Sequence, residues 1–122
     1  MSLDNEVKSA ETVVKDWYVY MLISQKDQSI YTGITTDLNR RVNQHNSGSG
    51  ARHTRSRRPY RLLGYVTIGE CPAFVESPQS RALKLEAKVK TLTHQEKLEL
   101  ALSRLWQGPL VELVNKNLVL GT

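Results

Sequence analysis

The chain has 122 residues, with 17 Lys or Arg and 12 Asp or Glu, which gives a formal net charge of +5 at pH 7. This length predicts one domain with a modest core, and no apolar run approaches the ~20 residues that a membrane span requires. The single cysteine, Cys71, cannot form an internal disulfide, and the N-terminus lacks the basic and apolar regions of a secretory signal, so we expect a cytoplasmic protein.

Residues 1–16 are polar and of mixed charge, which is typical of an extension outside a folded domain. The domain itself is predicted to occupy residues 17–106. A C-terminal tail at residues 107–122 follows, because the Gly-Pro pair at 108–109 is expected to end the last helix.

Two runs rich in Tyr, Val and Ile, residues 17–24 and 29–34, are predicted strands, and the polar connector between them predicts a hairpin. Because successive strand residues alternate between faces, Tyr18 and Tyr20 share one face. With an even number of residues in the loop, Tyr31 falls on that same face, close to Tyr20. The hairpin is therefore predicted to bring two phenols together.

A helix from about residue 37 to residue 45 follows, with Thr36 or Thr35 as its N-cap. At about 100° per residue, Arg41 and His45 lie within its apolar stripe and one turn apart. The helix is thus predicted to hold an arginine and a histidine over the sheet that carries the two tyrosines.

Positive charge is concentrated between residues 38 and 69, where there are seven arginines and no Asp or Glu. Arginine binds phosphate through a planar fork and stacks on bases. Residues 46–59 are also rich in Gly and Ser, so we interpret them as a mobile loop that binds the nucleic-acid backbone. The predicted contact residues are Arg52, His53, Arg55, Arg57 and Arg58. The alternative is a solvated basic loop that has no partner.

Residues 60–68 are a predicted third strand, in which Gly64 marks a bulge or the close approach of another element. Ser77 and Pro78 then start a helix that runs to about residue 92. A capping box at residues 93–96 begins the last helix, which is expected to reach about residue 106. The elements together predict an α/β (α+β) fold, with a small, three-stranded, mostly antiparallel sheet flanked by helices.

Glu86 is predicted to project within or beside the buried stripe of the helix at residues 78–92. An ionised carboxylate on a buried face is costly unless it meets a cation, a hydrogen-bond donor or a metal. From the helical wheel alone, a salt bridge, for instance to Arg41, and a metal ligand are equally good interpretations.

These residues resemble the GIY-YIG nucleases, which carry two short tyrosine-containing motifs, then an arginine on a helix, and later a glutamate on a second helix. Here residues 18–20 (YVY) stand at the first motif and residues 31–33 (YTG) at the second. The run TGITTDLNRRVNQH is similar to the small, single-domain bacterial members of the UPF0213 type. Two departures stand out: Tyr18 replaces the glycine of the first motif, and an asparagine that several members carry beyond the glutamate has no clear counterpart.

The resemblance implies the GIY-YIG endonuclease fold and a metal-dependent endonuclease that hydrolyses phosphodiester bonds in DNA to a 5′-phosphate and a 3′-hydroxyl. It implies that Glu86 holds one divalent ion, Mg²⁺ or Mn²⁺, and that Arg41 stabilises the phosphoryl oxygens. Tyr20 would be the general base and Tyr31 would orient the water or the phosphate. His45 would accept or relay the proton, or position Tyr20.

The predicted domain has no evident specificity module, so recognition of branched or damaged structure, or targeting by a partner protein, is favoured over recognition of a long site. DNA is favoured over RNA as the substrate, and a monomer or a weak dimer is expected. The alternative function is a non-catalytic DNA- or RNA-binding module with a vestigial nuclease site. Simple phosphate binding, however, has no use for a carboxylate that faces the substrate.

Overall fold

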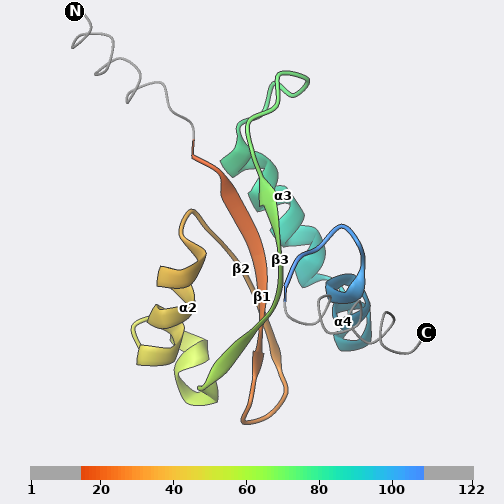
Figure 1. Ribbon diagram of the computed structural model, residues 1–122. Coiled ribbons are helices and arrows are strands. Elements are labelled where there is room, and N and C mark those ends of the chain that lie inside the picture. The colour runs from red at the N-terminus through yellow and green to blue at the C-terminus, as the bar shows by residue number, and fades with distance from the viewer. Residues whose placement is uncertain (1–14, 109–122) are drawn as a thin grey trace, which may run out of the picture.

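The computed structural model describes residues 15–108, except for the side chain of His53. A three-stranded antiparallel sheet of order β2-β1-β3 has helices on both of its faces (Figure 1). The elements are β1 (Trp17–Ser24), β2 (Ile30–Thr35), α2 (Leu38–Ser47), the 3₁₀ helix η1 (Arg52–Arg57), β3 (Tyr60–Ile68), α3 (Pro78–Lys90) and α4 (His94–Leu102). The predicted fold class is therefore confirmed.

The extension predicted at residues 1–16 and the tail predicted at residues 107–122 lie almost entirely outside the described residues. Within the described part of the chain, no helix combines the length and the apolar composition that crossing a bilayer would need. The described residues are thus one sheet and the helices that cover it.

β1 is the central strand, and most of its side chains are buried on both faces. Its pairing with β2 places Tyr20 opposite Gly33 and Leu22 opposite Tyr31. Tyr20 and Tyr31 are therefore diagonal neighbours on one face, and their ring centroids are 6.3 Å apart. The prediction that the hairpin brings these two phenols together is confirmed.

α3 and α4 cover the opposite face and form the apolar core with it (Figure 1). Hydrophobic burial of this kind is the main favourable contribution to folding. Both helices begin as predicted, α3 with Ser77 as its N-cap and α4 with the capping box of Thr93 and Glu96. The buried core residues are Val19, Met21, Leu63, Ala82, Val89, Ala101 and Trp106.

Gly64 lies at an irregularity of β3, as predicted. The register between β1 and β3 shifts between Met21 and Leu22, directly opposite this glycine. A Cβ atom on Gly64 would lie 3.3 Å from the carbonyl oxygen of Gln107, so the position is also one of close approach. Gln107 in turn forms two backbone hydrogen bonds of 2.8 Å with Tyr65, which attach the chain after α4 to β3.

The N-cap of α2 is Asp37, so the prediction of Thr36 or Thr35 is wrong. The Asp37 carboxylate accepts a hydrogen bond of 3.2 Å from the backbone N–H of Arg40, one of the amides that have no partner within the helix. The Thr35 hydroxyl oxygen accepts from the N–H of Asp37 at 3.1 Å. Thr35 therefore shapes the turn before the helix and does not cap it.

Residues 46–59, the predicted loop, contain regular structure at two places. α2 continues to Ser47 and ends at Gly48, which has a φ of 90°. The segment then forms η1, and Thr54 within η1 is fully buried. The segment therefore includes a short helix that an inward-facing threonine anchors, which composition alone does not reveal.

α3 and α4 both end earlier than predicted, and for the same reason. The hydroxyl of Thr91 donates to the carbonyl of Lys88 at 2.6 Å, and the hydroxyl of Ser103 donates to the carbonyl of Leu100 at 2.7 Å. Such side chains compete with the helical backbone for its carbonyl acceptors. α4 therefore ends four residues before Trp106, whose side chain then turns into the core.

Candidate active site

Tyr20 lies on the face of the sheet that α2 covers, and only 1% of its surface is exposed. Its hydroxyl is 2.9 Å from Nε2 of His45 on α2. A Cβ atom on Gly33, opposite Tyr20 on β2, would come within 2.6 Å of the phenol oxygen, a distance too short for any side chain. The glycine of the second motif therefore makes room for the phenol of the first.

His45 is fully buried, and both nitrogens of its ring are hydrogen-bonded. Nδ1 lies 3.0 Å from Oγ1 of Thr54, and this hydroxyl donates its one proton to the carbonyl of Ala51 at 2.6 Å. Oγ1 must therefore accept from Nδ1–H. In the neutral ring Nε2 then has no hydrogen and accepts from the O–H of Tyr20. Because Thr54 sets the tautomer of His45, the arrangement can pass a proton from Tyr20 to His45.

Burial raises the pKa of Tyr20 from 10.0 to about 12. The guanidinium of Arg41 opposes this rise through a hydrogen bond and through its charge, whereas the charges of Tyr31 and Glu86 add to it. All three groups therefore lie within electrostatic range of the phenol. Because the phenol keeps its proton at neutral pH, it can act as a base only if an acceptor such as His45 takes that proton in the same step.

Tyr31 and Arg41 surround this pair with partly exposed polar groups. The ring of Tyr31 lies 4.8 Å from the ring of His45 between centroids. Arg41 is half-buried on α2 and donates to Oε1 of Gln44 at 3.0 Å. Both side chains can thus reach a ligand that enters from solvent, while Tyr20 and His45 lie behind them.

Glu86 comes from α3, which packs on β1 and β2 from the opposite face. Its side chain is only 17% exposed, and Oε2 lies 3.3 Å from Nζ of Lys90, one turn later on the same helix. Among the described residues, its ion-pair partner is thus Lys90 and not the Arg41 that the sequence offered as an example. The burial of this carboxylate agrees with the helical wheel.

The residues that could hold a metal ion are few. Among residues 15–108, no group of three or more His, Cys, Asp or Glu side chains is arranged to hold one. Mg²⁺ is commonly held by one or two carboxylates, with water and substrate phosphate filling its other positions. Glu86 is a single, largely buried carboxylate whose charge reaches Tyr20, and such a group fits an ion of that kind.

The basic segment reaches the site through η1. Thr54 points inward to His45, while the exposed arginines on either side of it form the outer surface of the segment. Arg57 differs from the rest, because its Nε pairs with Asp27 in the turn between β1 and β2 at 3.1 Å. The side chain of His53 lies outside what the structure describes. The exposed arginines of this surface are Arg52, Arg55 and Arg58.

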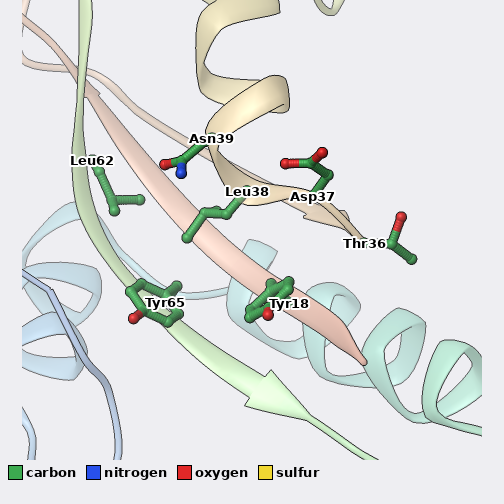
Figure 2. Close-up of a pocket in the computed structure, with 7 residues that line it drawn as sticks. All are labelled: Tyr18, Thr36, Asp37, Leu38, Asn39, Leu62 and Tyr65. Carbon is green, nitrogen blue, oxygen red and sulfur yellow. The ribbon is translucent and has the colours of Figure 1, made fainter. Parts of the chain in front are cut away.

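A hollow of about 370 Å³ lies on the same face of the sheet as Tyr20 (Figure 2). Tyr18 and Tyr65 stand beside each other at its base, edge to face, with ring centroids 5.9 Å apart. Leu38 and Asn39, from the first turn of α2, lie on its other side. The contact between the two tyrosines is one of ring packing.

Sequence reasoning missed three residues of the site. Thr54 and Gly50 both contact His45, and a Cβ atom on Gly50 would lie 2.5 Å from Nδ1. No local sequence pattern marks either residue as part of the site, because both contacts depend on how residues 48–57 fold back over α2. Lys90 could have been found from the sequence, because it lies four residues after Glu86 on a predicted helix, and this spacing pairs opposite charges.

A family model described as the GIY-YIG catalytic domain matches residues 16–99. A UPF0213 protein of Cupriavidus pinatubonensis is 42% identical over 87 residues, which cover 71% of this chain and 87% of that protein. A UPF0213 protein of Haloquadratum walsbyi is 38% identical over 88 residues, which cover 72% of this chain and 90% of that protein. The solution NMR structure of a UPF0213 protein from Bacillus halodurans is 39% identical and matches with a TM-score of 0.39, covering 70% of this chain and 81% of that one. The chain thus belongs to the GIY-YIG family, which is the family that its motifs resemble.

Proposed function

We propose that the protein is a metal-dependent endonuclease that hydrolyses phosphodiester bonds in DNA to a 5′-phosphate and a 3′-hydroxyl. The observation that carries this proposal is the buried hydrogen bond of 2.9 Å between Tyr20 and His45, within range of the charges of Arg41 and Glu86. Membership of the GIY-YIG family supports a nuclease. A module that only binds phosphate has no need of an acid–base pair behind its surface.

The protein's own groups supply the proton transfer. A water that attacks phosphorus must lose a proton, and Tyr20 accepts it while its own proton passes to Nε2 of His45. The imidazolium that results keeps its Nδ1–H bonded to Thr54, so the ring stays in place through the reaction. Tyr31, beside His45 and closer to solvent, orients the water or the phosphate.

Negative charge that develops on the phosphate oxygens requires positive groups in fixed positions. Arg41 supplies one such group from α2. Glu86 would hold one divalent ion, Mg²⁺ or Mn²⁺, in agreement with its burial and with the general use of such ions by GIY-YIG nucleases. When bound, the ion would act as a Lewis acid toward the phosphate oxygens and the leaving group.

The proposed substrate is DNA rather than RNA, recognised by structure or damage rather than by a long sequence. Arginines hold a nucleic-acid backbone without reading its bases, and those of η1 form the exposed basic surface beside His45. Targeting by a partner protein would serve the same end. A monomer or a weak dimer is sufficient, because every proposed catalytic group comes from one chain.

The test is cleavage of supercoiled plasmid and of branched DNA oligonucleotides, with Mg²⁺, Mn²⁺ or EDTA. The native chain should nick both substrates with either metal and neither substrate in EDTA. Glu86→Gln keeps the shape of the side chain but removes its charge, and should lower the rate about 100-fold or more, since a metal contributes several kcal/mol to transition-state stabilisation.

Glu99→Gln is the matched control, because Glu99 is an exposed carboxylate on α4. It should cleave as the native chain does. Cleavage that persists unchanged in both Glu86→Gln and Arg41→Ala would point to a contaminating nuclease. Tight DNA binding by the native chain without any cleavage would support a non-catalytic module instead.

A further inference from the structure

A pocket of about 540 Å³ opens beside the candidate active site, next to the outer strand β2. We call it the lysine pocket. Tyr31 belongs both to this pocket and to the ring cluster around His45. A chain-like ligand that lies against Tyr31 would therefore continue into the pocket. The lining residues are Ile30, Tyr31, Thr32, Ala51, Lys90 and Lys97.

The lysine pocket contains two cations, and none of its lining residues is acidic. Lys97, on α4, is partly buried, and this burial, followed by the charge of Lys90, lowers the pKa of its ammonium group. Lys90, the last residue of α3, has a side chain that is 54% exposed and reaches Glu86 at 3.3 Å. Two ammonium groups in one pocket repel each other, and the partial desolvation of Lys97 adds to that cost. An anion in the pocket would relieve both effects.

We infer that the lysine pocket binds a backbone phosphate of the nucleic acid, adjacent in the strand to the phosphate that is cleaved. The identity of this ligand rests on the proposed nuclease function. Ala51, which lines the pocket, immediately precedes Arg52 on the exposed surface of η1. The lysines therefore extend the basic surface of η1 past the catalytic groups, and the backbone has a continuous path across the site.

Lys90 would then have two anions within its range, the carboxylate of Glu86 and the bound phosphate. Its ammonium group pairs with Glu86 when the pocket is empty and turns to the phosphate when the pocket is filled. Filling the pocket thus frees the carboxylate of Glu86 for a divalent ion. By linkage, phosphate in the pocket and the ion at Glu86 strengthen each other's binding by the same factor.

The first test measures DNA binding in EDTA by the fluorescence anisotropy of a fluorescein-labelled branched oligonucleotide over a range of salt. Lys90→Met and Lys97→Met keep most of the apolar stem and remove the charge. Each should weaken binding several-fold at low salt and lower the slope of log affinity against log salt by about one, the value for one lost phosphate contact. Lys88→Met, an exposed lysine of α3 outside the pocket, should change the slope less.

Equal slopes for all three variants would overturn the inference, because the two lysines would then act only as general surface charge. Lys97→Arg should keep the native slope, which separates a lost charge from a disturbed fold. If the native chain does not cleave DNA but the slopes differ as expected, the phosphate site stands and the nuclease proposal fails. If the native chain cleaves DNA but the slopes do not differ, the nuclease proposal stands and the phosphate site fails.

The second test measures Mn²⁺ binding to the free protein by electron paramagnetic resonance. Because Lys90 competes with the ion for Glu86, Lys90→Met should bind Mn²⁺ several-fold more tightly than the native chain, whereas Lys88→Met should not. Adding an oligonucleotide with a non-bridging phosphorothioate should tighten Mn²⁺ binding to the native chain and less so to Lys90→Met. Equal Mn²⁺ affinities in all three proteins would contradict the exchange of Lys90 between Glu86 and phosphate.

Discussion

The two faces of the sheet use the same central strand for different purposes. Toward α3 and α4, β1 contributes Val19 and Met21 to an apolar core. Toward α2 it contributes Tyr20, which is hydrogen-bonded to His45, itself bonded to the buried Thr54. Buried polar groups are tolerated when they satisfy one another, and these three do. Stability and chemistry are thus divided between alternate residues of one strand.

α3 is the exception that joins the two faces. Ala82 and Val89 on this helix belong to the apolar core, but Glu86 between them is only 17% exposed and contributes charge at Tyr20. The comparison therefore predicts that substitutions in the core affect unfolding, that substitutions on the α2 side affect cleavage, and that α3 connects both.

Tyr20→Phe should have the largest effect on cleavage with little effect on the fold. The ring remains, but the hydroxyl that is proposed to pass its proton to His45 is lost, so the rate of plasmid nicking should fall by about 100- to 10,000-fold. The free energy of unfolding in urea should change by about 1 kcal/mol, the net value of one hydrogen bond. A variant that nicks plasmid at the native rate would remove Tyr20 from the mechanism.

Trp106→Ala should show the opposite behaviour. It removes a nearly buried indole from the α3–α4 side and should lower the free energy of unfolding by about 3–5 kcal/mol. At a temperature where the variant is still folded, cleavage per folded molecule should stay near the native value. A loss of specific activity comparable to that of Tyr20→Phe would show that the two faces are not independent.

Gly33→Ala should affect both properties. The added methyl group would meet the phenol of Tyr20, so overpacking should cost about 1–3 kcal/mol and move the hydroxyl away from His45. Urea unfolding and plasmid nicking should therefore both decline. Gly69→Ala is the control, because a Cβ atom there meets only the carboxylate of Asp16.

Thr54→Val should remove the hydrogen bond that fixes the tautomer of His45. The substitution removes the hydrogen bond between Nδ1–H and the Thr54 hydroxyl from a buried site at a cost of about 1–3 kcal/mol, and the neutral ring can move its hydrogen to Nε2. Nitrogen chemical shifts of the imidazole should report this change, and nicking should slow. Thr54→Ser, which restores the hydroxyl, should recover both; a native spectrum in Thr54→Val would contradict the assigned path.

The smallest effect concerns alkaline pH. The pKa of Tyr20 is about 12 in the folded chain against 10.0 for the ordinary group, so the unfolded chain loses this proton first. The stability that this group contributes is complete below pH 10 and is lost as the pH rises toward 12. Urea unfolding between pH 9 and 11.5 should show a steeper decline for the native chain than for Tyr20→Phe. Equal declines would mean that the phenol is not held protonated by burial.

Much of the fold follows from local signals. The bounds of β1 and β3, the N-caps of α3 and α4 and the irregularity at Gly64 were all predictable, because turn, cap and strand residues act over a few positions. The helix ends were less so, since the hydroxyls of Thr91 and Ser103 act through geometry that composition does not show.

The site divides in the same way. Tyr20, Tyr31, Arg41 and His45 were placed together by strand alternation and helical spacing, which are periodic. The contact of Thr54 with His45 was not foreseeable, because it depends on η1 folding against α2. Lys97 reaches the lysine pocket only through the turn between α3 and α4, so its role also required the structure.

The sheet has two edge strands, β2 and β3, and the backbone pairing of Gln107 with Tyr65 covers part of the β3 edge. The unpaired backbone N–H and C=O groups of an edge strand can hydrogen-bond to a strand of another chain, which leads to domain-swapped dimers and aggregates. On β3 the backbone of Gln107 already occupies part of that position. A shortened chain that ended before Gln107 would expose this edge of β3 and should self-associate, so residues 103–108 cover part of the sheet edge as well as closing over the core.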